Sequence, residues 1–234
     1  MSQDEYKSTA PFYDRVLTPM LKTLRKDICT YINYRGYHSV IDICCGTGDQ
    51  LQMLQRPSMN LVGIDNSAAM LAYARNRCSE HVALHLLDAE QLQPPEEPFD
   101  CALLVFSLHE KHPTTRDRLF ANARQMVRQG GTLIIADYSH AIEGMQGKVV
   151  SSLVTPVIER CAGKEHYRNY QDWRTRGALE GFLDRHGLAV DVISRPYAQT
   201  VLCCAHVVND DKEEFGRRIA LLNQSLETAA AHTE

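Results

Sequence analysis

Hydrophobic and polar positions along this chain alternate between two kinds of spacing, and each change of spacing marks a predicted element. Short apolar runs of strand length are separated by longer segments whose apolar residues recur every three or four positions, as on one face of a helix. The runs predict strands at 39–44, 60–64, 81–87, 99–106 and 132–137, and the longer segments predict helices near 49–55, 67–77 and 113–128. This alternation predicts a parallel sheet with helices on both faces.

The spacing changes at both ends of the alternating region. Before it, residues 16–32 carry apolar positions at helical intervals, interrupted early by Pro19. After it we expect helices at 141–161, kinked at Pro156, and at 170–186, then strands at 188–194 and 200–208 and a polar helix at 211–230. The short connection between the last two strands predicts an antiparallel hairpin. The expected fold is therefore α/β and Rossmann-like. It has a doubly wound, mostly parallel seven-stranded sheet with the last strand antiparallel, an extra N-terminal helix and a helical insertion after strand five.

Composition and charge narrow the class of partner. The formal net charge is −4 and the pI is near 6.2, so the chain has no general field to attract nucleic acid or an anionic membrane. Residues 1–5 lack the features of a signal peptide, and no apolar run approaches the roughly 20 residues that a bilayer requires. We expect a cytoplasmic protein with a small-molecule substrate, no nucleic acid and no membrane span.

The eight cysteines show no Cys-x-x-Cys spacing. Neighbouring side chains on a strand point to opposite faces, so Cys44 with Cys45 and Cys203 with Cys204 are poor pairs of metal ligands. Free cysteine is among the most buried residue types. We therefore expect most of these residues to be reduced and to lie in the core.

A glycine turn follows the first strand at Gly46 and Gly48. In this position, glycine lets a ligand approach the backbone N–H groups at a helix N-terminus. Plain turns from strand to helix also use glycine, so the meaning of this turn depends on the residues that follow it.

Acidic residues end three of the first five predicted strands, where an open parallel sheet binds its ligands. Asp65 follows the glycine turn by about 20 residues, the spacing at which a carboxylate binds ribose hydroxyls, and Asp88 is placed to face an adenine amine. The alternative for each is the capping of a helix N-terminus. Leu51 stands where a dinucleotide site has its third glycine, and Asp49 would repel a pyrophosphate but suit an ammonium group. A nucleoside with a cationic amino-acid tail fits these residues better than a dinucleotide.

Five segments occur in the order of one enzyme superfamily: 40–48 (VIDICCGTG), 63–65 (GID), 88–89 (DA), 99–109 (FDCALLVFSLH) and 133–138 (LIIADY). Together they resemble the class I S-adenosylmethionine-dependent methyltransferases. The segment 42–49, with Tyr13 and Asp14 near the N-terminus, resembles the branch of the ubiquinone/menaquinone biosynthesis C-methyltransferases. The resemblance implies a methyltransferase that uses S-adenosyl-L-methionine.

The resemblance also implies which residues bind the cofactor. Asp42 would hold the methionine ammonium, Gly46 and Gly48 would lie under the ribose and methionyl part, and Asp65 would bind the ribose. The other implied contacts are Asn66 and Met70 around the adenine, Asp88 and Ala89 at the adenine edge, Phe106 and Ser107 beside the methionyl group, and Tyr13 as a cap. Cys44 departs from the commonest motif of the superfamily, which has glycine there.

We expect one domain over residues 1–234, because no Pro/Gly/Ser-rich linker divides the chain. Within it, the N-terminal helical cap covers 1–35 and the cofactor-binding core covers 36–138. The helical insertion on the substrate side covers 139–186, and the terminal hairpin and helix cover 187–234.

Transfer of a methyl group from a sulfonium is an in-line displacement, which needs alignment and exclusion of water but no metal. The candidate catalytic residues are His109 and Tyr138, and His109 is either a base or only a cofactor contact. Residues 166–170 are either an acceptor wall or a solvated start of a helix. The acceptor, its reacting atom (C, O, N or S) and the oligomeric state, including a homodimer, remain open. So do two other functions, which are an aminopropyltransferase and a non-catalytic protein with the same fold.

Overall fold

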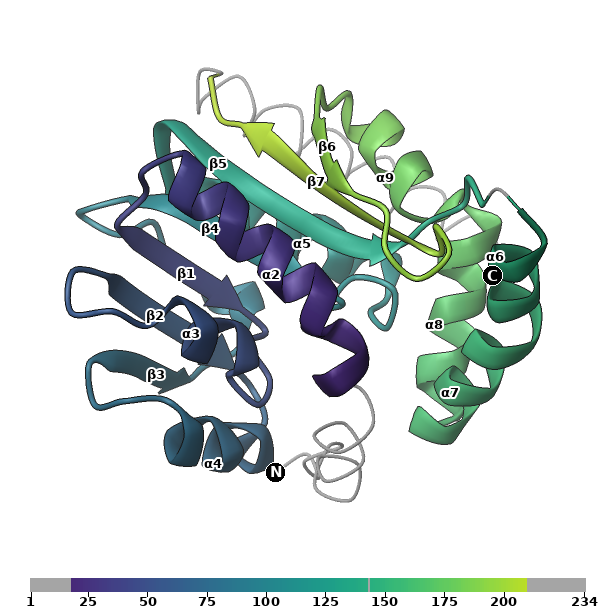
Figure 1. Cartoon of the computed structure of the whole chain (residues 1–234), viewed down its shortest axis with the longest axis horizontal. Helices are drawn as coiled ribbons and strands as arrows, with labels where there is room; N and C mark the ends of the chain where they lie inside the picture. The colour runs from purple at the N-terminus through teal and green to yellow at the C-terminus, as the bar shows by residue number, and fades with distance from the viewer. Residues whose placement is uncertain (1–17, 143, 210–234) are drawn as a thin grey trace.

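A computed structural model of the chain describes residues 18–142 and 144–209. Its centre is one sheet of seven strands in the order β3-β2-β1-β4-β5-β7-β6 (Figure 1). The strands are β1 (Ser39–Ile43), β2 (Asn60–Asp65), β3 (Val82–Leu86), β4 (Phe99–Val105), β5 (Val127–Tyr138), β6 (Asp191–Ser194) and β7 (Val201–Val207). Strands β1 to β5 pair in parallel, and β7 runs antiparallel to both of its neighbours. The predicted fold class, with an antiparallel last strand, is confirmed.

Helices cover both faces of the sheet. Helices α2 (Thr18–Tyr34), α3 (Asp49–Leu54) and α4 (Ala68–Arg77) pack on one face, and α5 (Pro113–Gln125), α8 (Lys164–Thr175) and α9 (Ala178–His186) pack on the other. Successive strand residues divide between the two faces, as Val40 and Ile41 do in β1. Cys203 and Cys204 divide in the same way, and all eight cysteines are free thiols.

The helical insertion differs from its prediction in two respects: its second helical segment begins at Lys164 instead of residue 170, and this segment is divided. The single helix expected at 170–186 is two helices, α8 and α9, because Gly177 adopts a left-handed φ of 86° and ends the first of them. The helix expected at 141–161 is present as α6 (Gly144–Val149), a π-helical turn (Val150–Val154) and α7 (Thr155–Ala162). Its irregular turn directly precedes Pro156, which has no N–H to donate to the helix ladder.

Strand β5 begins earlier than predicted. The Gly130-Gly131 pair predicts the end of a helix, yet the strand runs through it from Val127. A Cβ on Gly131 would lie 2.6 Å from the carbonyl oxygen of Asp100, so glycine here permits close approach of β4.

Several predictions lie outside the described residues. They are the cofactor cap Tyr13, the first residues of the N-terminal helix and the helix at 211–230. The domain boundaries stay a prediction. Within the described residues, no helix is both long enough and apolar enough to cross a membrane.

Candidate functional site

A pocket opens at the carboxyl ends of the central strands. Apart from Gly48, it is lined by every predicted cofactor residue of the described chain, namely Asp42, Cys44, Gly46, Asp65, Asn66, Met70, Asp88, Ala89, Phe106 and Ser107. These residues lie at or beyond the carboxyl ends of four strands, β1 to β4. The pocket also has lining residues that the sequence did not single out, among them Arg25, Lys111 and Thr115.

The turn after β1 is built from three residues with left-handed backbone. The φ angles are 63° at Cys44, 55° at Gly46 and 77° at Gly48. A side chain is strained in this conformation, which gives a physical reason why glycine is favoured where Cys44 stands. A Cβ on Gly46 would meet nothing within 4 Å, whereas one on Gly48 would lie 2.9 Å from the Cβ of Ala74. Gly46 therefore leaves room in the pocket, and Gly48 permits the packing of α4.

Asp65 ties the glycine turn to the end of β2. Its Oδ2 accepts a hydrogen bond from the Gly46 N–H and its Oδ1 accepts one from the Ser67 N–H, both at 2.8 Å. The N-terminal cap of α4 is Ser67, whose hydroxyl accepts from the Met70 N–H. Burial raises the pKa of Asp65 against the effect of the two backbone donors. The carboxylate retains lone pairs for further donors.

Asp88 has the structural role that the sequence left as its alternative. Its Oδ1 accepts from the Glu90 N–H at 3.0 Å and so caps the short 3₁₀ helix Ala89–Gln91. The residue still lines the pocket, so capping and ligand contact are compatible here.

The two acids near the turn, Asp42 and Asp49, have different surroundings. Asp49 forms ion pairs with Arg25 at 3.1 Å and with Arg77 at 3.0 Å, so its charge is balanced within the protein. Asp49 also lines the pocket, so its predicted suitability for an ammonium group stays a prediction. Asp42, only 3% exposed, is the better candidate. Burial raises its pKa to about 7, with Arg25 opposing the shift.

At the end of β4, Phe106 and Ser107 line the same pocket. Phe106 has a φ of 53°, which turns the chain sharply after the strand. The hydroxyl oxygen of Ser107 is buried and has no hydrogen-bond partner among the described residues. A buried hydroxyl of this kind is satisfied when a polar ligand group binds beside it.

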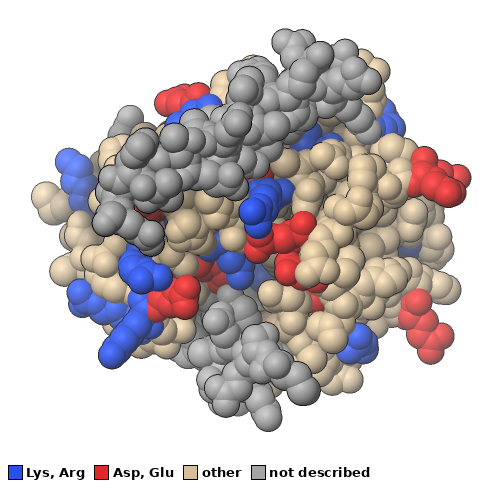
Figure 2. Space-filling view, turned by 180° about the vertical axis from the view of Figure 1, so that it is seen from behind, with Lys and Arg blue, Asp and Glu red and all other residues tan. Residues whose placement is uncertain are grey.

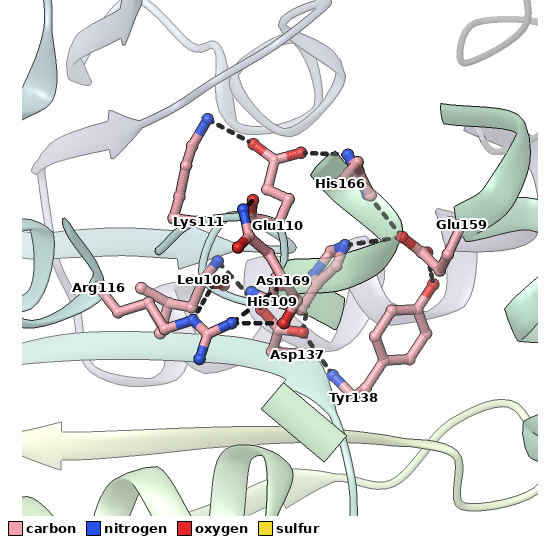
Figure 3. Close-up of polar contacts among 10 residues, drawn as sticks. All are labelled: Leu108, His109, Glu110, Lys111, Arg116, Asp137, Tyr138, Glu159, His166 and Asn169. Carbon is pink, nitrogen blue, oxygen red and sulfur yellow. Dashed lines mark hydrogen bonds and ion pairs between the residues drawn. The ribbon is translucent and has the colours of Figure 1, made fainter. Parts of the chain in front are cut away.

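A network of charged side chains lies next to the pocket (Figure 3). His109 places Nδ1 2.9 Å from Asp137 Oδ1 and Nε2 3.5 Å from Glu159 Oε2. Burial lowers the pKa of His109, but the two carboxylates outweigh it and raise this pKa well above its usual value. The Tyr138 hydroxyl donates to Glu159 Oε1 at 2.6 Å. The two predicted catalytic residues are thus joined by one carboxylate.

The network continues through the helical insertion. His166 Nε2 lies 2.5 Å from Glu159 Oε2, and its Nδ1 lies 3.5 Å from Glu110 Oε2, which also pairs with Lys111. Sequence reasoning missed Glu159 because no motif surrounds it. Burial raises the pKa of Glu159, but His109 and His166 hold it well below the usual value.

Phe106 packs between the pocket and the part of the network formed by His109 and Tyr138. The ring of Phe106, which lines the pocket, lies 6.0 Å from the ring of His109 and 5.4 Å from that of Tyr138, measured between centroids. Neither His109 nor Tyr138 is itself a lining residue, whereas Glu110 and Lys111 are. The polar network therefore reaches the pocket through Glu110 and Lys111.

Comparison with known proteins agrees with this geometry. A family model described as a methyltransferase domain matches residues 40–131. The ubiquinone/menaquinone biosynthesis C-methyltransferase UbiE of Hahella chejuensis is 32% identical over 113 residues, which are 45% of each chain. The carboxy-S-adenosyl-L-methionine synthase of Campylobacter hominis is 28% identical over 147 residues, 62% of this chain and 61% of that protein.

The chain spans about half the length of the curated relatives that it matches. Among solved structures, the plantazolicin methyltransferase BpumL in complex with SAH has a TM-score of 0.63 at 15% identity, over 89% of this chain and 92% of that chain. This likeness shows the fold. With the strand order and the match over residues 40–131, the comparisons show that this chain resembles the class I S-adenosylmethionine-dependent methyltransferases, in particular the ubiquinone/menaquinone biosynthesis C-methyltransferase branch.

Proposed function

We propose that this chain binds S-adenosyl-L-methionine in the pocket and moves its methyl group to a small-molecule acceptor. The proposal rests on one observation. The predicted cofactor residues, which come from the ends of four strands, line the same pocket. Ligands of open parallel sheets bind at this edge.

The pocket residues fit the parts of this cofactor. Asp42 offers a buried carboxylate for the ammonium group, Asp65 has lone pairs left for ribose hydroxyls, and Gly46 leaves space beside the backbone. Ser107 offers a hydroxyl that has no partner among the described residues. Asn66, Met70, Asp88 and Ala89 would surround the adenine, Cys44 and Phe106 the methionyl part, and Gly48 supports the turn. The capping role of Tyr13 remains a prediction.

When bound, the cofactor supplies a methyl group activated by a sulfonium. The work of the chain is then to hold the donor, align the acceptor on the far side of the methyl carbon and exclude water. Phe106 supports this role, because its ring lines the pocket and packs against the rings of His109 and Tyr138.

We propose the acceptor side to be the network around His109 and Tyr138. A base needs a free lone pair, and both ring nitrogens of His109 face carboxylates. His109 therefore fits a positioning role better than the role of a base. The Tyr138 hydroxyl donates to Glu159, and burial together with that carboxylate raises its pKa well above the usual value. Tyr138 therefore acts as a neutral hydrogen-bond donor.

The distribution of charged side chains on the surface fits a small acceptor better than a nucleic acid. On the face in Figure 2, basic and acidic side chains of the described residues alternate in small groups, unlike the broad basic surface that binds nucleic acid. A cytoplasmic location stays a prediction, and the oligomeric state stays open.

The first experiment is calorimetry with the purified full chain. We expect binding of S-adenosylmethionine and S-adenosylhomocysteine but not of NAD, and roughly 10- to 100-fold weaker binding by Asp65→Ala, since that variant loses a charge-assisted contact. The matched control is Asp191→Ala, because Asp191 is an exposed acid on β6. Equal affinities in the two variants would contradict the assigned site, and no binding at all would contradict the function.

The second experiment identifies the chemistry. The enzyme and S-adenosylmethionine labelled in its methyl group are incubated with fractionated cell extract, and labelled products are identified by mass. A labelled product that needs an intact Asp65 supports methyl transfer. Cofactor consumption without any labelled product would favour another adenosyl chemistry.

A further inference from the structure

Two histidines and a glutamate converge beside the pocket, and the proposed function leaves their arrangement unexplained. His109 follows β4, Glu159 lies on α7 and His166 lies on α8, and one donor atom from each lies within 4.8 Å of the others. Figure 3 shows the three side chains pointing toward one another. Glu159 is 3% exposed and His109 is 4% exposed.

We propose that His109 Nε2, His166 Nε2 and Glu159 Oε2 bind a divalent transition-metal ion of the Zn²⁺ class. Two imidazoles and one carboxylate are a donor set that such ions accept, with at least one coordination position left open. The proposal goes beyond methyl transfer and does not depend on it, because metal binding is measurable without cofactor or acceptor.

The distances suit an ion after a small adjustment. Donors at the bond lengths of tetrahedral zinc lie roughly 3.3 Å from one another. Both imidazole Nε2 atoms point at the same oxygen, Glu159 Oε2, from 3.5 Å for His109 and 2.5 Å for His166. Insertion of an ion needs the His166 contact to lengthen by about 1 Å.

The outer partners are those that metal-binding side chains usually have. Each imidazole directs its other nitrogen at a carboxylate: His109 Nδ1 lies 2.9 Å from Asp137, and His166 Nδ1 lies 3.5 Å from Glu110. The second oxygen of Glu159 accepts the Tyr138 hydroxyl. Such contacts orient metal ligands and fix the histidine tautomer. An ordinary ion-pair network does not require both Nε2 atoms to meet at one oxygen.

Charge and access also agree with a cation. The carboxylates of Glu159, Asp137 and Glu110 surround the two imidazoles and supply negative charge to balance an ion of charge +2. Glu110 lines the pocket, and the His166 side chain is 10% exposed, so an ion has a polar route inward. From the sequence no metal is expected, because transfer of a methyl group from a sulfonium requires none.

The test is a metal titration of the full chain, prepared without a histidine tag, treated with a chelator and kept free of cofactor. We expect the wild type to bind one equivalent of Co²⁺ with a visible band typical of low coordination number, and Zn²⁺ to displace it. Glu159→Gln and His166→Asn should weaken Co²⁺ binding roughly 100-fold or more, and Glu110→Gln roughly 10- to 100-fold. His140→Asn should bind as the wild type does, because His140 is an exposed histidine outside the cluster.

Thermal unfolding of each variant without metal verifies that it folds. His166 is less buried than Glu159, so His166→Asn still tests the proposal if Glu159→Gln does not fold. Loss of the band in His166→Asn and its retention in His140→Asn support the site. If the wild type takes up less than one equivalent, or binds no more tightly than a folded His166→Asn variant, the cluster is an ion-pair network and the proposal fails. A failure of methyl transfer alone leaves this result unaffected.

Discussion

The proposed cofactor side, around the glycine turn, and the proposed acceptor side, around His109, are built in opposite ways. On the cofactor side, backbone groups dominate: the Gly46 and Ser67 amides bind Asp65, and left-handed φ angles shape the turn. On the acceptor side, the contacts join buried charged side chains, from His109 and Asp137 to Glu159 and His166. The first side depends on local conformation, and the second depends on charge compensation between distant segments.

Because of this difference, substitutions on the two sides should change different properties of the protein. A turn tolerates loss of one hydrogen bond at a modest cost, whereas a buried charge that loses its partner destabilises the fold strongly. We therefore expect substitutions on the acceptor side to affect stability most, and substitutions on the cofactor side to affect ligand affinity most.

The largest effect is expected for Asp137→Ala. Asp137 is fully buried and accepts from the backbone N–H groups of Leu108, His109 and Tyr138 as well as facing the His109 ring. Its removal should lower the free energy of unfolding by about 3–5 kcal/mol in urea titrations. The matched change Asp65→Ala should cost about 1–3 kcal/mol. Equal losses in the two variants would contradict the expected difference in stability between the two sides.

A second pair of variants separates the roles of the two glycines in the turn. Gly48→Ala should destabilise the protein by about 2–4 kcal/mol, because it adds a left-handed alanine and a clash with Ala74. Gly46→Ala should cost only about 1–2 kcal/mol, since its Cβ meets open space, yet should weaken binding of S-adenosylmethionine. Calorimetry and urea titration measure both effects. If Gly48→Ala proves the more stable variant, the assigned packing is wrong.

A third prediction concerns pH and the cofactor. Asp42 has a pKa of about 7, and only its ionised form attracts an ammonium group. Affinity for S-adenosylmethionine should therefore rise as pH increases through 7, by roughly eightfold between pH 6 and pH 7.5. Asp42→Asn should bind weakly with little pH dependence. A flat wild-type profile would remove Asp42 from the ammonium site.

The smallest effect is expected for Asp100, which lies near the amino end of β4, whereas the pocket lies at the carboxyl ends of the strands. Burial of Asp100 raises its pKa, but hydrogen bonds from the His38 and Ser39 amides and from Arg128 outweigh this and lower it to about 2. The resulting stability is present above the unfolded-state pKa of about 4 and is lost as pH falls toward 2. Asp100→Asn should cost about 1 kcal/mol or less at pH 7, the cost should vanish near pH 2, and cofactor affinity should not change. A change in affinity would show coupling along β4.

The sequence allowed most of the cofactor side to be predicted. Apolar runs located the strands, and the residues that follow them line one pocket, because parallel strands bring their carboxyl ends to the same edge. The ion pairs of Asp49 were not predicted, since its partners Arg25 and Arg77 lie on other helices and no local pattern marks them. The split between α8 and α9 was missed although Gly177, with a left-handed φ of 86°, is a local signal for the end of a helix.

By itself, the sequence determined the alternation of elements, the glycine turn and the acids at the strand ends, since hydrophobic period and turn chemistry act over a few residues. Only the tertiary structure decided that Glu159 joins His109, Tyr138 and His166, and that Asp49 is neutralised. The physical reason is that charge compensation depends on distance in space. The packing of α7 against α8 places Glu159 and His166 within hydrogen-bonding reach of residues that are far away in the chain.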